Sequence, residues 1–164
     1  MTDRTALRPI RQLRLAVCET ALDLVRLGLN RGTSGNVSLR CPGGFLITPS
    51  GRPPERIHPA DIVFMTLDGQ AEGRLPPSSE WRMHRDIYAA RPDADAVIHT
   101  HAAFCTTLAC QHRAIPPYHY MIAKAGGTDI RCAPYATYGT QALSDAALTA
   151  LEGRRACLLA HHWK

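Results

Sequence analysis

The segment Asp95-Ala96-Val97-Ile98-His99-Thr100-His101 joins a short apolar run to a His-x-His pair. The run is rich in β-branched residues, which predicts a buried β-strand that delivers both histidines at its carboxyl end. In a strand, residues i and i+2 point to the same face, with a rise of roughly 6.6 Å between them. Two imidazoles placed in this way could bind one metal ion, but the pair alone is weak evidence for a metal site.

Two further side chains extend the ligand set. Glu80 follows Pro76-Pro77-Ser78-Ser79, a pattern typical of a helix start, and His162 follows an expected last strand at 156–160. A fold that gathers these ends would give three imidazoles and one carboxylate, which bind zinc at about 2.0–2.2 Å. Zinc is therefore the predicted metal. It could act as a Lewis acid on a hydroxyl and a carbonyl of a ketose.

Length and composition predict one domain spanning residues 1–164, with a single core. No apolar run approaches the roughly 20 residues that span a bilayer, and neither a signal peptide nor a Cys-x-x-Cys pair is found, so we expect a soluble cytoplasmic protein with no membrane partner. The net charge is +5, but the basic residues are spread along the chain. This favours a small anionic substrate over a nucleic acid.

The periodicity predicts hairpins and helices in alternation, and hence an antiparallel or mixed sheet with helices packed on it. Helices are expected over residues 9–29, from 80 through the following turns, over 102–111 and over 141–151. Strands are expected before and after a hairpin turn at 42–44, and over 61–67, 95–98, 130–133 and 156–160.

Three loops rich in glycine and hydroxyl side chains accompany the expected ligands, at residues 33–36, 48–51 and 78–79. Backbone amides, small hydroxyls and a helix N-terminus are the usual parts of a phosphate site. Each loop alone also fits an ordinary turn. Ser78-Ser79 differs because it directly precedes Glu80, so an anion at the helix start would lie one small sugar from the metal.

Five motifs, in the right order over nearly the whole chain, resemble the class II aldolase/adducin family. They are Gly35-Asn36-Val37-Ser38, Ile47-Thr48-Pro49-Ser50-Gly51, Pro77-Ser78-Ser79-Glu80-Trp81-Arg82-Met83-His84, His99-Thr100-His101 and His119-Tyr120-Met121-Ile122-Ala123. The resemblance implies a three-layer α/β/α fold with a mainly antiparallel central sheet. It also implies a homotetramer with active sites between subunits.

The same resemblance implies roles for particular residues. One zinc ion per subunit would be held by Glu80, His99, His101 and His162. The phosphate of a phosphorylated sugar would be held by Thr33, Asn36, Ser50, Gly51, Ser78 and Ser79. Glu80 would be the acid/base, and Tyr120 would reach into a neighbour's site. The implied reaction cleaves a phosphorylated ketose to dihydroxyacetone phosphate and an aldehyde.

Alternatives stay open within and outside this chemistry. Related 4-epimerases usually carry Asp where this chain has Glu80, whereas sibling dehydratases and decarboxylases keep Glu. A non-catalytic module like the adducin head is the alternative of another class, and such modules lack the histidines. Relatives continue from an Asn-His-Gly motif into further helical structure, whereas this sequence has His161-His162-Trp163-Lys164. We therefore expect a domain without the family's usual C-terminal segment.

Overall fold

The computed structural model describes residues 9–162, so Trp163 lies outside the described residues. The chain divides into two compact units, the first ending at Thr100 and the second beginning at His101. Among the helices described, none is long and apolar enough to span a membrane.

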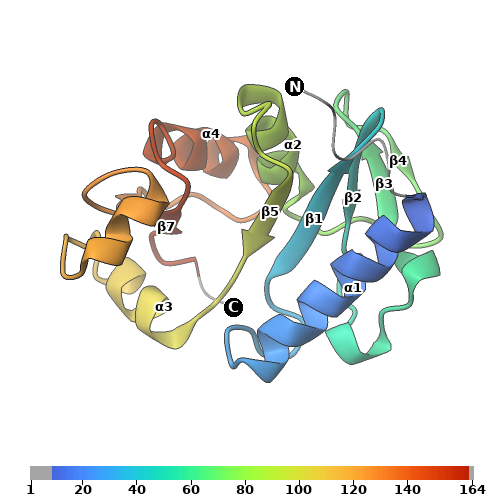
Figure 1. Ribbon diagram of the computed structural model, residues 1–164, viewed down its shortest axis with the longest axis horizontal. Coiled ribbons are helices and arrows are strands. Elements are labelled where there is room, and N and C mark those ends of the chain that lie inside the picture. The colour runs from blue at the N-terminus through green and yellow to red at the C-terminus, as the bar shows by residue number, and fades with distance from the viewer. Residues whose placement is uncertain (1–8, 163–164) are drawn as a thin grey trace. The chain divides into compact units, whose positions relative to one another are not determined.

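The first unit is built on a five-stranded antiparallel sheet with strand order β4-β3-β2-β1-β5 (Figure 1). Its strands are β1 (Asn36–Cys41), β2 (Gly44–Ile47), β3 (Val63–Thr66), β4 (Ala71–Glu72) and β5 (Ala96–His99). Cys41 pairs with Gly44 across the predicted hairpin turn, and Gly43 within the turn has a positive φ of 83°. The hairpin prediction is confirmed, whereas β4 was not predicted.

Two helices cover opposite faces of this sheet, α1 (Ile10–Arg26) and α2 (Trp81–Ala90). Successive strand residues point to opposite faces, so Leu46 packs in the cluster with Val17 of α1, whereas Phe45 and Ile47 pack in the cluster with Tyr88 of α2. Two short 3₁₀ segments, η1 (Pro54–Arg56) and η2 (Pro59–Asp61), connect β2 to β3. The predicted three-layer α/β/α arrangement is confirmed.

The second unit contains a parallel pair of strands, β6 (Arg131–Ala133) and β7 (Cys157–Leu159). The helices α3 (Ala103–Cys110) and α4 (Gln141–Ala150) were predicted, and α4 packs on both strands through buried residues that include Leu143. Thr140 caps α4 by accepting a hydrogen bond from the backbone N–H of Leu143 at 3.3 Å. A further 3₁₀ segment, η3 (Tyr120–Ala125), was not predicted.

The prediction of a buried strand before His99 is wrong. Within residues 9–162, β5 lies at the edge of the sheet with β1 as its one partner strand, and Ile98 within it is 51% exposed. The strand also ends at His99, because the partner of His99 is Asn36, the first residue of β1, and the ladder has no further partner. His101 therefore lies beyond the strand and begins the second unit.

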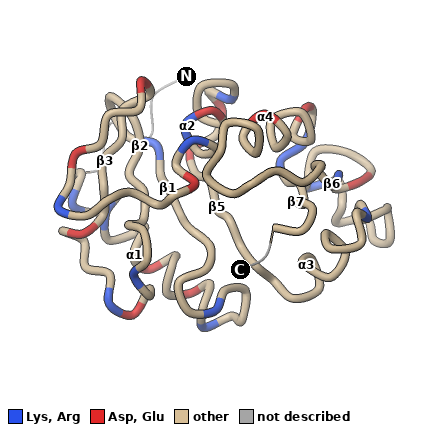
Figure 2. The backbone as a smooth tube through the Cα atoms, turned by 180° about the vertical axis from the view of Figure 1, so that it is seen from behind, with Lys and Arg blue, Asp and Glu red and all other residues tan. Residues whose placement is uncertain are grey.

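Charged residues of both signs are interspersed along the chain in each unit (Figure 2). Several basic side chains form ion pairs with nearby carboxylates, as in Arg85–Asp86 at 2.6 Å and Arg154–Asp129 at 2.7 Å. Among the residues that the structure describes, the basic side chains are thus distributed over several elements.

All six cysteines are unbridged, and Cys18 and Cys41 are buried in the cluster beneath α1. Burial raises the pKa of each of these two thiols to about 11, so both are un-ionised at neutral pH. They act as small apolar side chains of the core, whereas Cys110 is exposed.

Replacing Leu46 by alanine tests the packing of the sheet on α1. Leu46 is fully buried, so Leu46→Ala should lower the free energy of unfolding by about 2–5 kcal/mol, from lost transfer energy and a cavity. Urea unfolding measures this change. The matched control is Leu27→Ala, since Leu27 is 71% exposed and its loss should change stability by less than about 0.5 kcal/mol. Equal losses in the two variants would contradict the layer arrangement.

Candidate active site

A column of polar side chains fills the contact between β1 and α2. Alternate residues of β1 point to this face, and every fourth residue along α2 returns to the side that meets it. The rise is roughly 6.6–6.8 Å over two strand residues and about 6.0 Å over four helical residues, so the two spacings nearly match. The members of this polar column are Asn36, Ser38 and Arg40 from β1, and Glu80, His84 and Tyr88 from α2 and the residue before it.

Glu80 and His99 meet at one end of the polar column. The side-chain amide of Asn36 donates a hydrogen bond to Oε2 of Glu80 at 2.9 Å, and Nε2 of His99 lies 3.5 Å from the same oxygen. Asn36 and His99 are register partners on neighbouring strands, so both face Glu80 from the sheet. Glu80 is only 6% exposed. A carboxylate and an imidazole are therefore held together in a nearly dry setting.

His84 occupies the middle of the column and is fully buried. Its Nε2 contacts Oδ1 of Asn36, and its Nδ1 lies 2.7 Å from Oγ of Ser38, which in turn lies 2.8 Å from the hydroxyl of Tyr88. Burial lowers the pKa of His84 to about 4, although the charge of Glu80 acts in the opposite direction. His84 is thus neutral at pH 7.

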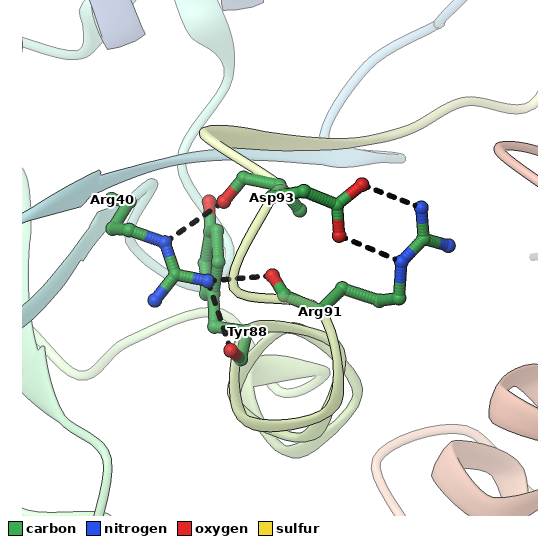
Figure 3. Close-up of polar contacts among 5 residues, drawn as sticks. Arg40, Tyr88, Arg91 and Asp93 are labelled. Carbon is green, nitrogen blue, oxygen red and sulfur yellow. Dashed lines mark hydrogen bonds and ion pairs between the residues drawn. The ribbon is translucent and has the colours of Figure 1, made fainter. Parts of the chain in front are cut away.

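Arg40 closes the other end of the column at the C-terminus of α2 (Figure 3). Its Nη2 donates to the backbone carbonyls of Tyr88 and Arg91, each at 2.9 Å, and its Nε donates to the carbonyl of Ala94 at 2.9 Å. Its guanidinium also lies over the Tyr88 ring, 4.7 Å from the centroid. The bonds to Tyr88 and Arg91 satisfy carbonyls at the helix end, and together with the bond to Ala94 they fix where α2 ends relative to β1.

The loops that precede β3 and α2 are joined by backbone hydrogen bonds. The N–H of Ser78 donates to the carbonyl of Thr48 and the N–H of Ser50 donates to the carbonyl of Pro76, each at 3.0 Å. Oγ of Ser78 accepts from the backbone N–H of Glu80 at 3.4 Å, so this serine helps to form the helix start that the sequence predicted. Two of the predicted phosphate loops therefore lie side by side next to Glu80.

The third predicted loop, at 33–36, lines a small hollow together with Thr48, Pro49 and Arg52. Gly35 has a φ of +74°, and a Cβ there would come within 2.3 Å of the side-chain amide nitrogen of Asn30, so only glycine fits. Thr33 and Asn36 line this hollow, although the Asn36 side chain is engaged by Glu80 and His84. The sequence reasoning missed Arg52. Its signal was a cation directly after the loop that ends at Gly51.

The remaining predicted phosphate residues differ in exposure. Ser78 is buried and Ser79 is half-buried beside it, whereas Ser50 and Gly51 are exposed at the end of their loop. Gly51 has a positive φ of 67° and no atom within 4 Å of a Cβ built there, which leaves its backbone open to a ligand.

In the second unit, His101 and His162 approach each other. His101 lies two residues before α3, His162 follows β7, and α3 packs against β7. Their ring centroids are 5.6 Å apart and ring nitrogens of the two come within 4.8 Å of each other. Tyr120, the other predicted catalytic residue, begins η3 and is 79% exposed.

The candidate ligands in each unit are donor types that bind divalent metal ions. Two ligands bound at about 2.1 Å in a tetrahedral shell lie roughly 3.4 Å apart, and the 3.5 Å between Glu80 Oε2 and His99 Nε2 matches that edge. The two imidazoles of the second unit are the ligand type that zinc shares with several other transition metals. The residues therefore fit a metal ion.

Comparisons with known proteins agree with these features. A sequence model described as the class II aldolase and adducin N-terminal domain matches residues 15–162. A 5-methylthioribulose-1-phosphate/5-deoxyribulose-1-phosphate aldolase of Rhodospirillum rubrum is 56% identical over 150 residues, 92% of this chain and 68% of the relative. The L-fuculose phosphate aldolase of Escherichia coli is 51% identical over 151 residues, 92% of this chain and 70% of that protein.

A solved structure of an L-fuculose 1-phosphate aldolase matches with a TM-score of 0.89 and 42% identity, covering 98% of this chain and 76% of that one. The resemblance to the class II aldolase/adducin family predicted from the motifs is confirmed. The chain is also shorter than these relatives, as expected.

The buried His84 predicts a specific loss of stability in acid. Because its pKa falls from 6.5 to about 4 on folding, the unfolded chain binds a proton first, and the stability that the neutral ring contributes is lost as the pH falls from 6.5 toward 4. Between pH 7 and pH 5 the wild type should lose roughly 2 kcal/mol more than His84→Gln, by denaturant unfolding at both values. An equal loss in both proteins would show that His84 is not buried as a neutral ring.

Proposed function

Because the chain belongs to the class II aldolase and adducin N-terminal domain family, we propose that it is a metal-dependent aldolase that cleaves a phosphorylated ketose to dihydroxyacetone phosphate and an aldehyde. The observation that carries this proposal is the buried Glu80 beside His99, directly after the phosphate-type loop Ser78-Ser79. A metal ligand, a proton carrier and an anion cradle are thus provided by adjacent residues. Cytoplasmic localisation is part of the proposal.

We assign one zinc ion per subunit to Glu80, His99, His101 and His162. Thr100 alone separates the two histidines of the His-x-His pair, so their Cα atoms are at most about 7 Å apart along the chain. This short covalent connection limits how far His101 can lie from His99, which supports the proposal that both bind the same ion. A bound zinc ion would act as a Lewis acid on the substrate hydroxyl and carbonyl oxygens.

The proposed mechanism assigns separate tasks to the protein's own residues. The phosphate is held by Thr33, Asn36, Ser50, Gly51, Ser78 and Ser79, where backbone amides and the start of α2 favour an anion. Bond cleavage removes a proton from the hydroxyl of the carbon that becomes the aldehyde, and a proton is added to the carbon that loses this bond. We assign both transfers to Glu80 at the start of α2: its ionised carboxylate takes up the proton from the hydroxyl and then delivers it to that carbon, so the step neither gains nor loses a proton overall.

Tyr120 and the quaternary structure belong to the same proposal. The phenol ring is 79% exposed on η3, so it is available to a neighbouring subunit. We propose a homotetramer in which Tyr120 of one subunit completes the site of the next.

Other reactions of related sugar phosphates are the runners-up, namely 4-epimerisation, dehydration and decarboxylation. The names of the two sequence relatives favour aldol cleavage, and they suggest L-fuculose 1-phosphate and 5-methylthioribulose 1-phosphate as first substrates. A non-catalytic module like the adducin head is disfavoured, because this chain retains His99 and His101.

Substitution of Glu80 tests the proton transfer. Glu80→Gln keeps the size of the side chain but removes the basic oxygen, so kcat for cleavage of either substrate should fall by about 10²- to 10⁴-fold. An enzyme-coupled assay for dihydroxyacetone phosphate measures the rate, with metal content checked in parallel. The matched control is Glu72→Gln on the exposed strand β4, which should retain wild-type rates. Unchanged cleavage by Glu80→Gln at full metal occupancy would remove the acid/base assignment.

Metal removal tests the ligand set. Dialysis against a chelator should abolish cleavage, and added zinc should restore it, because the charge that develops on the substrate would otherwise be uncompensated. His99→Gln should lower the metal content measured by elemental analysis, whereas His58→Gln, at an exposed histidine, should not. Full activity in metal-free protein would contradict the proposal.

A further inference from the structure

The donor and the acceptor of each hydrogen bond in the polar column can be assigned one after another, starting at Glu80. An ionised carboxylate only accepts hydrogen bonds, so the Asn36 group 2.9 Å away must be the NH₂ of its amide. The other end of that amide, Oδ1, then faces Nε2 of His84. A carbonyl oxygen only accepts, so Nε2 of His84 must carry a proton.

The same logic continues through His84 to Tyr88. A neutral imidazole has one N–H, so Nδ1 of His84 accepts, and the hydroxyl of Ser38 at 2.7 Å must donate to it. The Ser38 oxygen is then free to accept from the hydroxyl of Tyr88 at 2.8 Å. Four consecutive hydrogen bonds thus all point toward Glu80, and none can be reversed alone without placing two donors or two acceptors face to face.

From this geometry we infer that His84 is a positioning residue for the acid/base: it fixes the amide of Asn36 with its NH₂ toward Glu80, and Asn36 in turn holds the Glu80 carboxylate beside His99. The inference deepens the proposed function and rests on it for the role of Glu80. The two ends of an asparagine amide have nearly the same shape, so packing alone selects neither orientation. The N–H of His84 makes the selection, because only the amide oxygen can accept from it.

Burial makes this selection effective. His84 is fully buried, Ser38 is fully buried and Asn36 is 5% exposed, so water cannot replace a lost partner. The hydroxyl groups of Ser38 and Tyr88 set the tautomer of His84, because Ser38 donates to Nδ1 and Tyr88 donates to Ser38. The hydrogen bonds of Arg40 hold the C-terminal end of α2 in place. The last donor in this series of hydrogen bonds is the neutral amide of Asn36, so the polar column orients the Glu80 carboxylate without forming an ion pair with it.

The first experiment observes the tautomer in the metal-free protein. Long-range ¹H–¹⁵N spectra should show His84 protonated at Nε2 and unprotonated at Nδ1 from pH 5.5 to 9, with the signal identified by its loss in His84→Gln. A proton on Nδ1, or an imidazolium at pH 7, would overturn the inference. This measurement needs no activity, so it stands even if the chain cleaves none of the substrates tested.

The second experiment separates positioning from packing. The amide NH₂ of glutamine can replace Nε2–H of histidine, whereas leucine fills the space without a donor. His84→Leu should lower kcat by about 10- to 100-fold, the usual effect of removing such an outer partner, with KM changed less than about threefold. His84→Gln should recover kcat to within about fivefold of the wild type.

Both variants need the same fold for this comparison, which circular dichroism and thermal unfolding check. Equal loss of kcat in folded His84→Gln and His84→Leu would overturn the inference, as would a loss that appears only in KM. If His84→Leu does not fold, the tautomer and the kcat of His84→Gln still decide: an Nδ1 proton or a loss above tenfold would count against it. Absence of cleavage in the wild type would instead count against the proposed function.

Discussion

The structure depends on the match between a two-residue period in β1 and a four-residue period in α2. Each step of roughly 6.6–6.8 Å along the strand meets a step of about 6.0 Å along the helix, and a polar side chain is present at each meeting. Sliding α2 by one turn would leave buried groups such as Ser38 and His84 without these partners, at about 1–3 kcal/mol for each unsatisfied group. The distance between Glu80 and His99 is therefore set by the register of helix on strand.

Apolar packing and the polar column contribute different things to this contact. The apolar cluster beneath α2 supplies the hydrophobic free energy of this contact. Its fully buried members pack with Tyr88 and are Phe45, Ile47, Val63 and Met65. Such packing tolerates small shifts, since apolar contact has no direction. The hydrogen bonds of the column do not tolerate them. The apolar cluster thus holds α2 on the sheet, and the column determines where along the sheet it stays.

Local features of the fold were predictable, and long-range ones were not. Some features follow from residues that are adjacent in the sequence. They are the turn at 42–44, the helix start before Glu80 and the pair of possible metal ligands at His99 and His101. The edge position of β5 is not, because a short apolar run looks the same at the edge and at the centre of a sheet. The Ser38–His84 bond joins residues 46 positions apart. Its only signal was polar residues at alternate positions of one segment and at every fourth position of another.

The neutral Asn36 and His84 side chains of the column suit the two roles proposed for Glu80, metal ligand and proton carrier. A carboxylate that both binds a cation and carries a proton must be held in place and yet be able to change partners. An arginine at the position of Asn36 would form a bidentate ion pair and compete with the metal for both oxygens. The Asn36 amide gives one hydrogen bond at 2.9 Å, and behind it stands a histidine kept uncharged by burial. Asn36 and His84 thus orient the Glu80 carboxylate without adding a charge beside it. Its charge–charge interactions would then be with the metal ion and the substrate.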